Sequence, residues 1–332
     1  MVQQTDIDAA VRDSHIPAAK HWIGGKQVDA SDGNVMANTS PIDGQALGAL
    51  ARGTSEDVDR AVAAARRAFD DGRWSGLAPA ARKKVMHRIA DLIEQHMLEL
   101  AVLGVRDNGT EISMALRAEP GSAAGTFRYY AETCDNINGD IAPTPPGTLG
   151  LIHREPVGVV GAIVPWNFPL MMLAWKIGPA LAAGCSVIVK PAEQTSLTAL
   201  RVAELAHEAG IPRGVLQVLP GDGPSVGEPL GRHMDVDMLS FTGSTATGRR
   251  FLQYAADSNL KKVVLECSGK NPAVVFDDAE NLDHVAEHVV NAAFWNAGQN
   301  CSATSRLIIH SAVKDALMDK INARLRDWKT GD

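Results

Sequence analysis

The sequence predicts an α/β fold whose centre is a doubly wound parallel sheet with helices on both faces. Two observations predict it. From residue 158 onward, short apolar runs alternate with stretches of helical periodicity, and strands separated by single helices are typical of parallel sheets. Polar residues also follow these runs, at the strand ends where such sheets bind ligands; they are Asn167, Lys190, Glu193, Ser244 and Glu266.

Before this region, the sequence predicts short strands and then two helices. Residues 21–50 contain Gly24-Gly25 and Asp32-Gly33-Asn34, which suit tight turns between strands. Thr54 or Ser55 can cap a first helix, because apolar residues with a 3.6-residue period follow. A second helix is expected on the apolar stripe Ile89, Ile93, Met97 and Leu100, with Arg82, Lys83, Lys84 and Glu94 in solvent.

The elements of the sheet region follow a proline-rich segment, PTPPG, at 143–147. Each expected strand is a short apolar run, and each expected helix separates two such runs. The strands are expected at 158–164, 185–189, 215–219, 236–241 and 262–265, and the helices at 170–183, 197–209 and 245–255.

Length and charge narrow the class of protein. A chain of 332 residues is long enough for about two domains. Its net charge of -7 argues against nucleic acid as a partner, because binding to phosphates needs a clustered basic surface. The uncharged stretch 156–175 has the length of a membrane helix, but prolines in its middle favour a buried strand, a turn and a helix. We therefore expect no membrane partner.

The four cysteines, at 134, 185, 267 and 301, show neither C-x-x-C spacing nor histidines placed as fellow ligands. This pattern predicts no metal site and no disulfide framework. The N-terminal residues also lack the basic start and apolar segment of a secretory signal. Reduced thiols without such a signal indicate a cytoplasmic protein.

Two segments are candidates for binding a dinucleotide, although G-x-G-x-x-G is missing from the expected strand-to-helix junctions. In FTGSTATG (241–248), free N–H groups at a helix start suit a pyrophosphate; the alternative is an ordinary turn capped by Ser244. Lys190 and Glu193 follow a strand where an adenine ribose would lie, and a carboxylate there favours NAD over NADP. The alternative is a solvated lysine and glutamate on a surface loop.

Cys301 is the candidate nucleophile, because the segment WNAGQNCSA (295–303) is polar and an exposed thiol ionises readily. Cys185 begins an apolar strand, and Cys134 is interpreted as structural. Cys267 is the rival nucleophile. It directly follows Glu266, and in an extended strand the two side chains would point in opposite directions.

Taken together, these motifs resemble those of the aldehyde dehydrogenase superfamily. The matching segments are PWNFP (165–169), KPAEQT (190–195), FTGSTATG (241–248), LECSGKNP (265–272) and GQNCSA (298–303). Glu266 precedes Cys301 by 35 residues (301 − 266), a separation similar to that in the family. The likeness also includes WIGGKQVDA (22–30), DVDRAVAAARRAF (57–69) and REPVGVVG (154–161), so it covers nearly the whole chain.

The resemblance implies a Rossmann-like NAD(P)-binding domain at 1–265, with an N-terminal helical arm and a strand-rich oligomerisation segment near 134–155. Residues 266–332 would be the start of a second α/β domain, the catalytic domain. The chain would oxidise an aldehyde to a carboxylic acid and assemble as a homodimer or homotetramer. We expect the substrate to be an aliphatic aldehyde, and we further expect it to carry an amino substituent.

The resemblance also assigns the site residues. Cys301 would attack the aldehyde, and Asn167, with the backbone N–H of Cys301, would stabilise the resulting alkoxide by about 3–4 kcal/mol. Glu266 would activate the water that hydrolyses the thioester. The residues implied for binding NAD are Val164, Pro165, Trp166, Lys190, Glu193, Gly223, Gly243 and Ser244.

Two departures from the family bear on these inferences. Ser268 stands where glycine is usual, which weakens the inferred pose of Glu266. The chain also stops before a second family glutamate and a C-terminal arm, so we expect the isolated 332-residue chain to be poorly stable and nearly inactive, with an unpaired edge on the sheet begun at 272–309. Two alternatives remain open: a CoA-acylating aldehyde dehydrogenase, and an inactive fragment or non-catalytic NAD-binding relative.

Overall fold

The computed structural model describes residues 3–13 and 19–329. The chain divides into two compact units, Met1–Glu266 and Cys267–Asp332. The first unit is built on one large sheet, and the second contains two strands and two helices.

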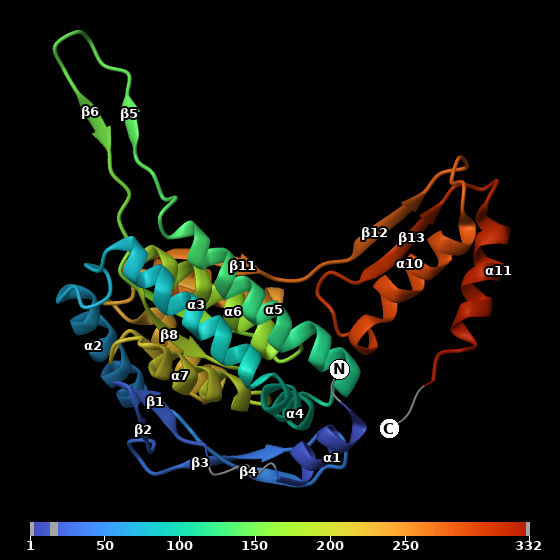
Figure 1. Cartoon of the computed structure of the whole chain (residues 1–332), viewed down its shortest axis with the longest axis horizontal. Helices are drawn as coiled ribbons and strands as arrows, with labels where there is room; N and C mark the ends of the chain where they lie inside the picture. Colours follow the sequence, from blue (N-terminus) through green and yellow to red (C-terminus); the bar gives the residue numbers. More distant parts are fainter. Residues whose placement is uncertain (1–2, 14–18, 330–332) are drawn as a thin grey trace. The chain divides into compact units, whose positions relative to one another are not determined.

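The sheet of the first unit has seven strands in the order β11-β10-β7-β8-β9-β1-β2. Figure 1 labels four of them, β11, β8, β1 and β2. The five strands from β11 to β9 are parallel, as the sequence predicts, and β1 and β2 are added antiparallel at one edge. The bounds are β1 His21–Ile23, β2 Lys26–Val28, β7 Val159–Ile163, β8 Ser186–Lys190, β9 Leu216–Val218, β10 Met238–Thr242 and β11 Lys262–Glu266.

The strand order reverses between β7 and β10. From β7 the chain adds β8 and β9 on one side, and it then returns to add β10 and β11 on the other side of β7. Such a reversal leaves a crevice outside the carboxyl ends of the two central strands, which is the usual ligand site of open α/β sheets.

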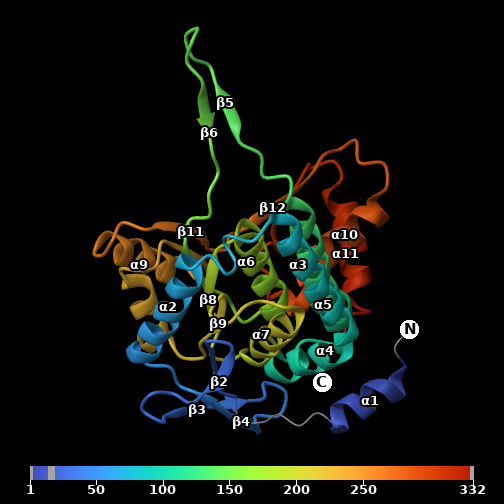
Figure 2. The ribbon, with the colours of Figure 1, turned by 60° about the vertical axis from the view of Figure 1, so that its left-hand side comes forward.

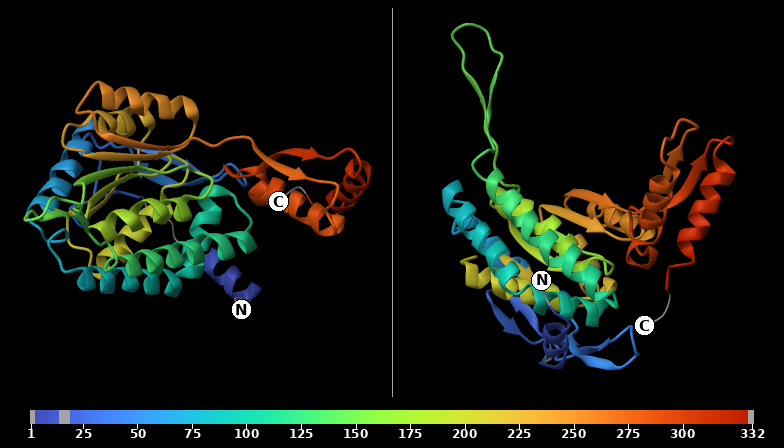
Figure 3. Two further views of the ribbon diagram at one scale, coloured as in Figure 1. Left: turned by 90° about the horizontal axis from the view of Figure 1, so that it is seen from above. Right: turned by 45° about the vertical axis from the view of Figure 1, so that its right-hand side comes forward.

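Helices cover both faces of this sheet (Figures 2 and 3). One face carries α6 (Pro169–Ala183) and α7 (Leu197–Ala209), and the other carries α2 (Ser55–Asp70) and α9 (Thr245–Ala256). Outside α6 and α7 lies a further layer of α3 (Pro79–Gln95), α4 (Met97–Asn108) and α5 (Ile112–Thr133). The doubly wound α/β fold predicted from the sequence is confirmed.

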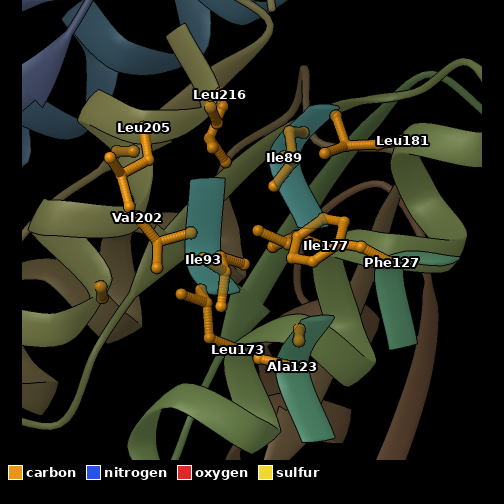
Figure 4. Close-up of a cluster of buried hydrophobic side chains, with 14 of the residues drawn as sticks. Ile89, Ile93, Ala123, Phe127, Leu173, Ile177, Leu181, Val202, Leu205 and Leu216 are labelled. Atoms are coloured by element: carbon orange, nitrogen blue, oxygen red, sulfur yellow. The ribbon is translucent and has the colours of Figure 1, made fainter. Parts of the chain in front are cut away.

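The largest core lies between this outer layer, α6, α7 and the sheet (Figure 4). Its side chains are buried, and each large aliphatic or aromatic one contributes about 1.5–3 kcal/mol relative to exposure. None of the helices in the described residues is long and apolar enough to cross a membrane. The labelled members of this core are Ile89, Ile93, Ala123, Phe127, Leu173, Ile177, Leu181, Val202, Leu205 and Leu216.

The outer layer corrects two predictions. The stripe from Ile89 to Leu100 spans two helices, because the chain leaves helical geometry at His96, between α3 and α4. Arg82 was expected in solvent and is only 7% exposed; its guanidinium donates to the carbonyl oxygens of Leu77 and Ala182, which replace the lost water. Helix α5 was not predicted, and it tolerates an internal proline, Pro120.

Smaller elements complete the first unit. Helix α1 (Gln4–Asp13) precedes the sheet, and β3 (Val35–Thr39) pairs with β4 (Ala46–Ala51). An antiparallel ribbon of β5 (Asp140–Ala142) and β6 (Gly150–Ile152) follows α5. A short π-helix (Gly223–Gly227) and α8 (Glu228–Arg232) lie between β9 and β10.

The second unit is also α/β. Strands β12 (Asn271–Val275) and β13 (Thr304–Ile309) pair in parallel. Helices α10 (Leu282–Phe294) and α11 (Lys314–Leu325) bury a small core of their own with Val275. The 3-10 turn Trp295–Gly298 connects α10 to the segment that carries Cys301.

Two carboxyl groups are buried in the outer layer of the first unit. Asp107, near the end of α4, accepts hydrogen bonds from the Leu197 backbone N–H (2.9 Å) and the Asn38 side chain (3.0 Å). Glu119, in α5, accepts from the backbone N–H groups of Leu170 (2.8 Å) and Met171 (3.0 Å). Burial outweighs these hydrogen bonds and raises the pKa of each carboxyl to about 7.

Asp107→Asn is expected to make folding stability less dependent on pH. The pKa of Asp107 is raised from 3.8 to about 7 in the folded chain, so stabilisation by its neutral form is complete below about pH 4 and is lost as the pH rises through about 7. When the pH rises from about 5.5 to about 8, ionisation of this group lowers the free energy of unfolding of the wild type by ~2 kcal/mol. Urea unfolding at both pH values measures the change.

The control is Asp235→Asn, which alters an exposed aspartate and should leave the pH dependence unchanged. An Asp107→Asn chain with the wild-type pH dependence would contradict a raised pKa for the buried carboxyl.

Candidate active site

The predicted polar residues of the first unit gather at the carboxyl edge of its sheet. Glu266 ends β11 opposite Thr242 of β10, and Lys190 ends β8 opposite Ile163 of β7. The loop with Asn167 follows β7 directly, beside the point where the strand order reverses. Tertiary structure thus brings Asn167, Lys190, Ser244 and Glu266 to one edge of one sheet.

The loop after β7 connects a buried strand to a buried helix. Val164 continues the strand by donating its N–H to the Lys190 carbonyl at 3.2 Å. Phe168 is buried, whereas Trp166 is 41% exposed. Pro169 begins α6, where its fixed φ and missing N–H cost nothing. The loop therefore lies beside the reversal point with the Trp166 side chain partly exposed, and it is anchored at both ends.

Lys190 is only 4% exposed, so the alternative of a solvated lysine is wrong. Its ammonium group donates to the Pro191 carbonyl (2.9 Å) and to Glu193 (3.3 Å). Burial lowers the pKa of Lys190, and the Glu193 carboxylate opposes this change. Gly227 of the π-helix borders the lysine, and a Cβ there would lie 3.8 Å from Lys190 Cδ.

The turn after β10 is a capped strand-to-helix junction. Gly243 donates to the Glu266 carbonyl at 3.0 Å, and a Cβ on Gly243 would lie 2.6 Å from Phe241 Cζ, so a larger residue would require the Phe241 ring to shift. The Ser244 hydroxyl accepts from the Thr247 N–H at 3.2 Å and caps α9. The ordinary turn capped by Ser244 is therefore present. Gly223 begins the π-helix, with open space where a Cβ would be.

Lys176 was missed by the sequence reasoning. Its ammonium group donates to the Ser240 hydroxyl at 2.9 Å, from α6 to β10. Burial lowers its pKa to about 8, and the charge of Glu266 opposes this change. The available signal was a single lysine in the otherwise apolar helix PLMMLAWKIGPALAA. A lone charge in such a helix indicates a buried partner.

Cys301 lies in the second unit, in the segment between the 3-10 turn and β13. It is half-buried. The Asn271 side chain donates to the carbonyl oxygens of Cys301 (3.0 Å) and Ala303 (3.3 Å) and ties this segment to β12. Asn296 and Ala297, just before it, have left-handed φ of 54°. The thiol is thus carried on an irregular segment held in place by Asn271, which the sequence reasoning also missed.

The other cysteines differ in environment. Cys134 and Cys185 are buried, and burial raises the pKa of both thiols, as expected of structural cysteines. Cys267 is half-buried and is followed by Ser268 at φ +64°, a left-handed conformation in which glycine has no steric cost. Within residues 3–13 and 19–329, no three His, Cys, Asp or Glu side chains are placed to hold a metal ion.

A doubly wound parallel sheet with polar loops beside its strand-order reversal defines a Rossmann-like α/β protein. Residues 28–332 match the model of the aldehyde dehydrogenase family. The chain belongs to this family, and the resemblance seen in the motifs is confirmed.

Relatives support the same assignment. The chain is 58% identical to an aminoacetaldehyde dehydrogenase from Pseudomonas aeruginosa, over 94% of this chain and 63% of the relative. It is 44% identical to the NADP/NAD-dependent aldehyde dehydrogenase PuuC of Escherichia coli, over 93% and 63%. The chain thus spans about 63% of the length of these curated relatives.

Solved structures agree with the fold. The aldehyde dehydrogenase KauB from Pseudomonas aeruginosa superposes with a TM-score of 0.97 at 46% identity, over 100% of this chain and 67% of that one. A mutant of the P. syringae indole-3-acetaldehyde dehydrogenase AldA, in complex with NAD+ and IAA, gives 0.97 at 44% identity with the same coverage.

Proposed function

We propose that this protein oxidises an aldehyde to a carboxylic acid with NAD as the hydride acceptor and Cys301 as the nucleophile. The observation that carries the proposal is the gathering of Asn167, Lys190, Ser244 and Glu266 at the ligand-binding edge of the sheet, in a chain of the aldehyde dehydrogenase family that also carries a half-buried thiol.

The donor groups at this edge fit a dinucleotide. Lys190 and Glu193 would hold the hydroxyls of the adenosine ribose, and the start of α9 at Ser244 would accept the pyrophosphate. Val164, Pro165, Trp166, Gly223 and Gly243 would line the remainder. NAD supplies a two-electron acceptor for hydride when it is bound. The carboxylate of Glu193 would repel a 2′-phosphate, which favours NAD over NADP.

The protein side chains would perform the remaining chemistry. The Cys301 thiolate attacks the carbonyl carbon, and the new S–C bond leaves an alkoxide that the Asn167 amide stabilises by about 3–4 kcal/mol. Loss of hydride from that carbon gives a thioester on Cys301. Glu266 removes a proton from water, which adds to the thioester; the carboxylic acid leaves and the thiol is restored. Glu266 is also the reason to favour water over CoA as the acyl acceptor.

The relatives support a substrate class. The 58% identity to an aminoacetaldehyde dehydrogenase favours a small aliphatic aldehyde with an amino group.

The four cysteines are free, which suits a reducing compartment such as the cytoplasm.

Copies of the chain would assemble through the ribbon of β5 and β6. Ile141 and Leu151 pair across it and are 73% and 70% exposed, and contiguous exposed apolar side chains mark protein interfaces. We therefore propose that the chain binds further copies of itself and forms a homodimer or homotetramer through this ribbon.

Thiol labelling tests the proposal directly. We expect iodoacetamide to modify Cys301 at least about tenfold faster than Cys134 and Cys185, whose burial keeps the thiols protonated. Saturating NAD should change the rate at Cys301 alone. Peptide mass spectrometry reports all four rates in one sample. Fastest modification at Cys267, or a Cys301 rate that does not respond to NAD, would count against the proposal.

A further inference from the structure

The loop that carries Trp166 and Asn167 is held from outside by the α4–α5 layer. Asn108, the last residue of α4, donates its side-chain N–H to the Trp166 carbonyl oxygen at 2.6 Å. Beyond the loop, Glu119 Oε2 accepts the N–H groups of Leu170 and Met171 at 2.8 and 3.0 Å. One side chain thus fixes a peptide inside the loop, and another fixes the start of the helix that follows.

Helix α6 depends on Glu119 for its N-terminal hydrogen bonds. The cap position is Phe168, which has no side-chain acceptor. Pro169 lacks an N–H, so Leu170 and Met171 supply the first free donors of the helix. A local Ser or Asp would normally accept them. Here the acceptor comes from α5, 51 residues away in sequence, so the position of the loop is set by the outer layer.

The neighbouring loop is held in the same way. Asp107 Oδ2 accepts the Leu197 N–H at 2.9 Å, where α7 begins, and Ser196 supplies no side-chain cap. Residues 191–196 connect Lys190 to that helix. Gly109 ends α4 in the left-handed conformation, and a Cβ there would lie 2.8 Å from Pro41 Cγ. The sequence Asp107-Asn108-Gly109 therefore ends one helix and contacts two loops.

We propose that three residues, Asp107, Asn108 and Glu119, hold the cofactor loops in position. We call these three residues the positioning frame. Asn108 and Glu119 set the loop of Trp166 and Asn167, and Asp107 sets the loop of Lys190 and Glu193. The inference rests on the proposed function, because it takes these loops to bind NAD. None of the three is a catalytic residue; each acts through the backbone it holds.

The first test compares Asn108→Asp with Asn136→Asp in the full chain. Asn136 follows the end of α5 and donates its side-chain N–H to the Glu132 carbonyl at 2.7 Å. Each replacement therefore removes an amide donor near the end of a helix from a backbone carbonyl and adds a carboxylate. Only Asn108 contacts a cofactor loop. Titration calorimetry with NAD should show affinity weakened about fivefold to tenfold by Asn108→Asp and unchanged by Asn136→Asp, while thermal unfolding shows similar small shifts in both.

The second test uses Glu119. Glu119→Gln keeps an acceptor oxygen for the two N–H groups and should retain NAD affinity within about twofold, whereas Glu119→Ala should weaken it. Equal NAD affinity in wild type, Asn108→Asp and Glu119→Ala would overturn the frame and leave the proposed function standing. A wild-type chain that does not bind NAD would overturn the proposed function and the frame together.

Discussion

In the full-length enzyme, replacing Cys301 by alanine is expected to lower aldehyde-dependent NADH production by at least about 10³-fold. Without the thiolate no S–C bond forms to the aldehyde carbon, and the hydride has no tetrahedral alkoxide from which to leave. Steady-state absorbance of NADH at saturating NAD and aldehyde measures the loss.

Cys267→Ala is the matched control, because Cys267 is the other half-buried thiol. It should retain turnover within about threefold. Loss of turnover on Cys267→Ala with retention on Cys301→Ala would transfer the nucleophile to Cys267 and contradict the proposed mechanism.

Glu266→Gln is expected to separate the two halves of the reaction. Hydride transfer precedes the step that needs a base, so about one NADH per chain should form rapidly. Hydrolysis should then slow by about 10²–10⁴-fold, the usual contribution of general-base catalysis. Stopped-flow absorbance gives the burst, and acid-quenched mass spectrometry should detect the acyl group on Cys301.

Glu208→Gln serves as the control, since Glu208 is an exposed glutamate of α7. It should show wild-type turnover without a burst. A Glu266→Gln protein that turns over at the wild-type rate would exclude Glu266 as the base. Release of acyl-CoA in place of free acid, when CoA is added to the wild type, would favour the acylating alternative.

The sheet region could be predicted closely because its signal is local. The strands at 159–163 and 186–190 are buried along their whole length, so they read as apolar runs, and they lie within one residue of their predicted bounds. The capping box of Thr54 and Asp57 is also a local pattern, and it begins α2 where a helix start was expected. Asn167, Lys190 and Glu266 could be placed at one edge because parallel strands share a direction.

The remainder depends on contacts that no local pattern contains. The break at His96 leaves the apolar periodicity intact, so α3 and α4 read as one helix. Arg82 is buried because its N–H groups donate to the carbonyl oxygen of Leu77 and to that of Ala182, which lies 100 residues away in sequence. Glu119 is a charged residue within a helix, and only the packed structure shows that it accepts buried backbone N–H groups of Leu170 and Met171.

The ribbon of β5 and β6 links local order to association. Two-stranded ribbons have marginal stability alone in water, and the apolar pair Ile141 and Leu151 gains little while it faces solvent. If a second copy covers that pair, the ribbon folds and the copies associate in a single equilibrium. Dilution would then loosen the ribbon and separate the copies together, so protein concentration would set how much of this segment is ordered.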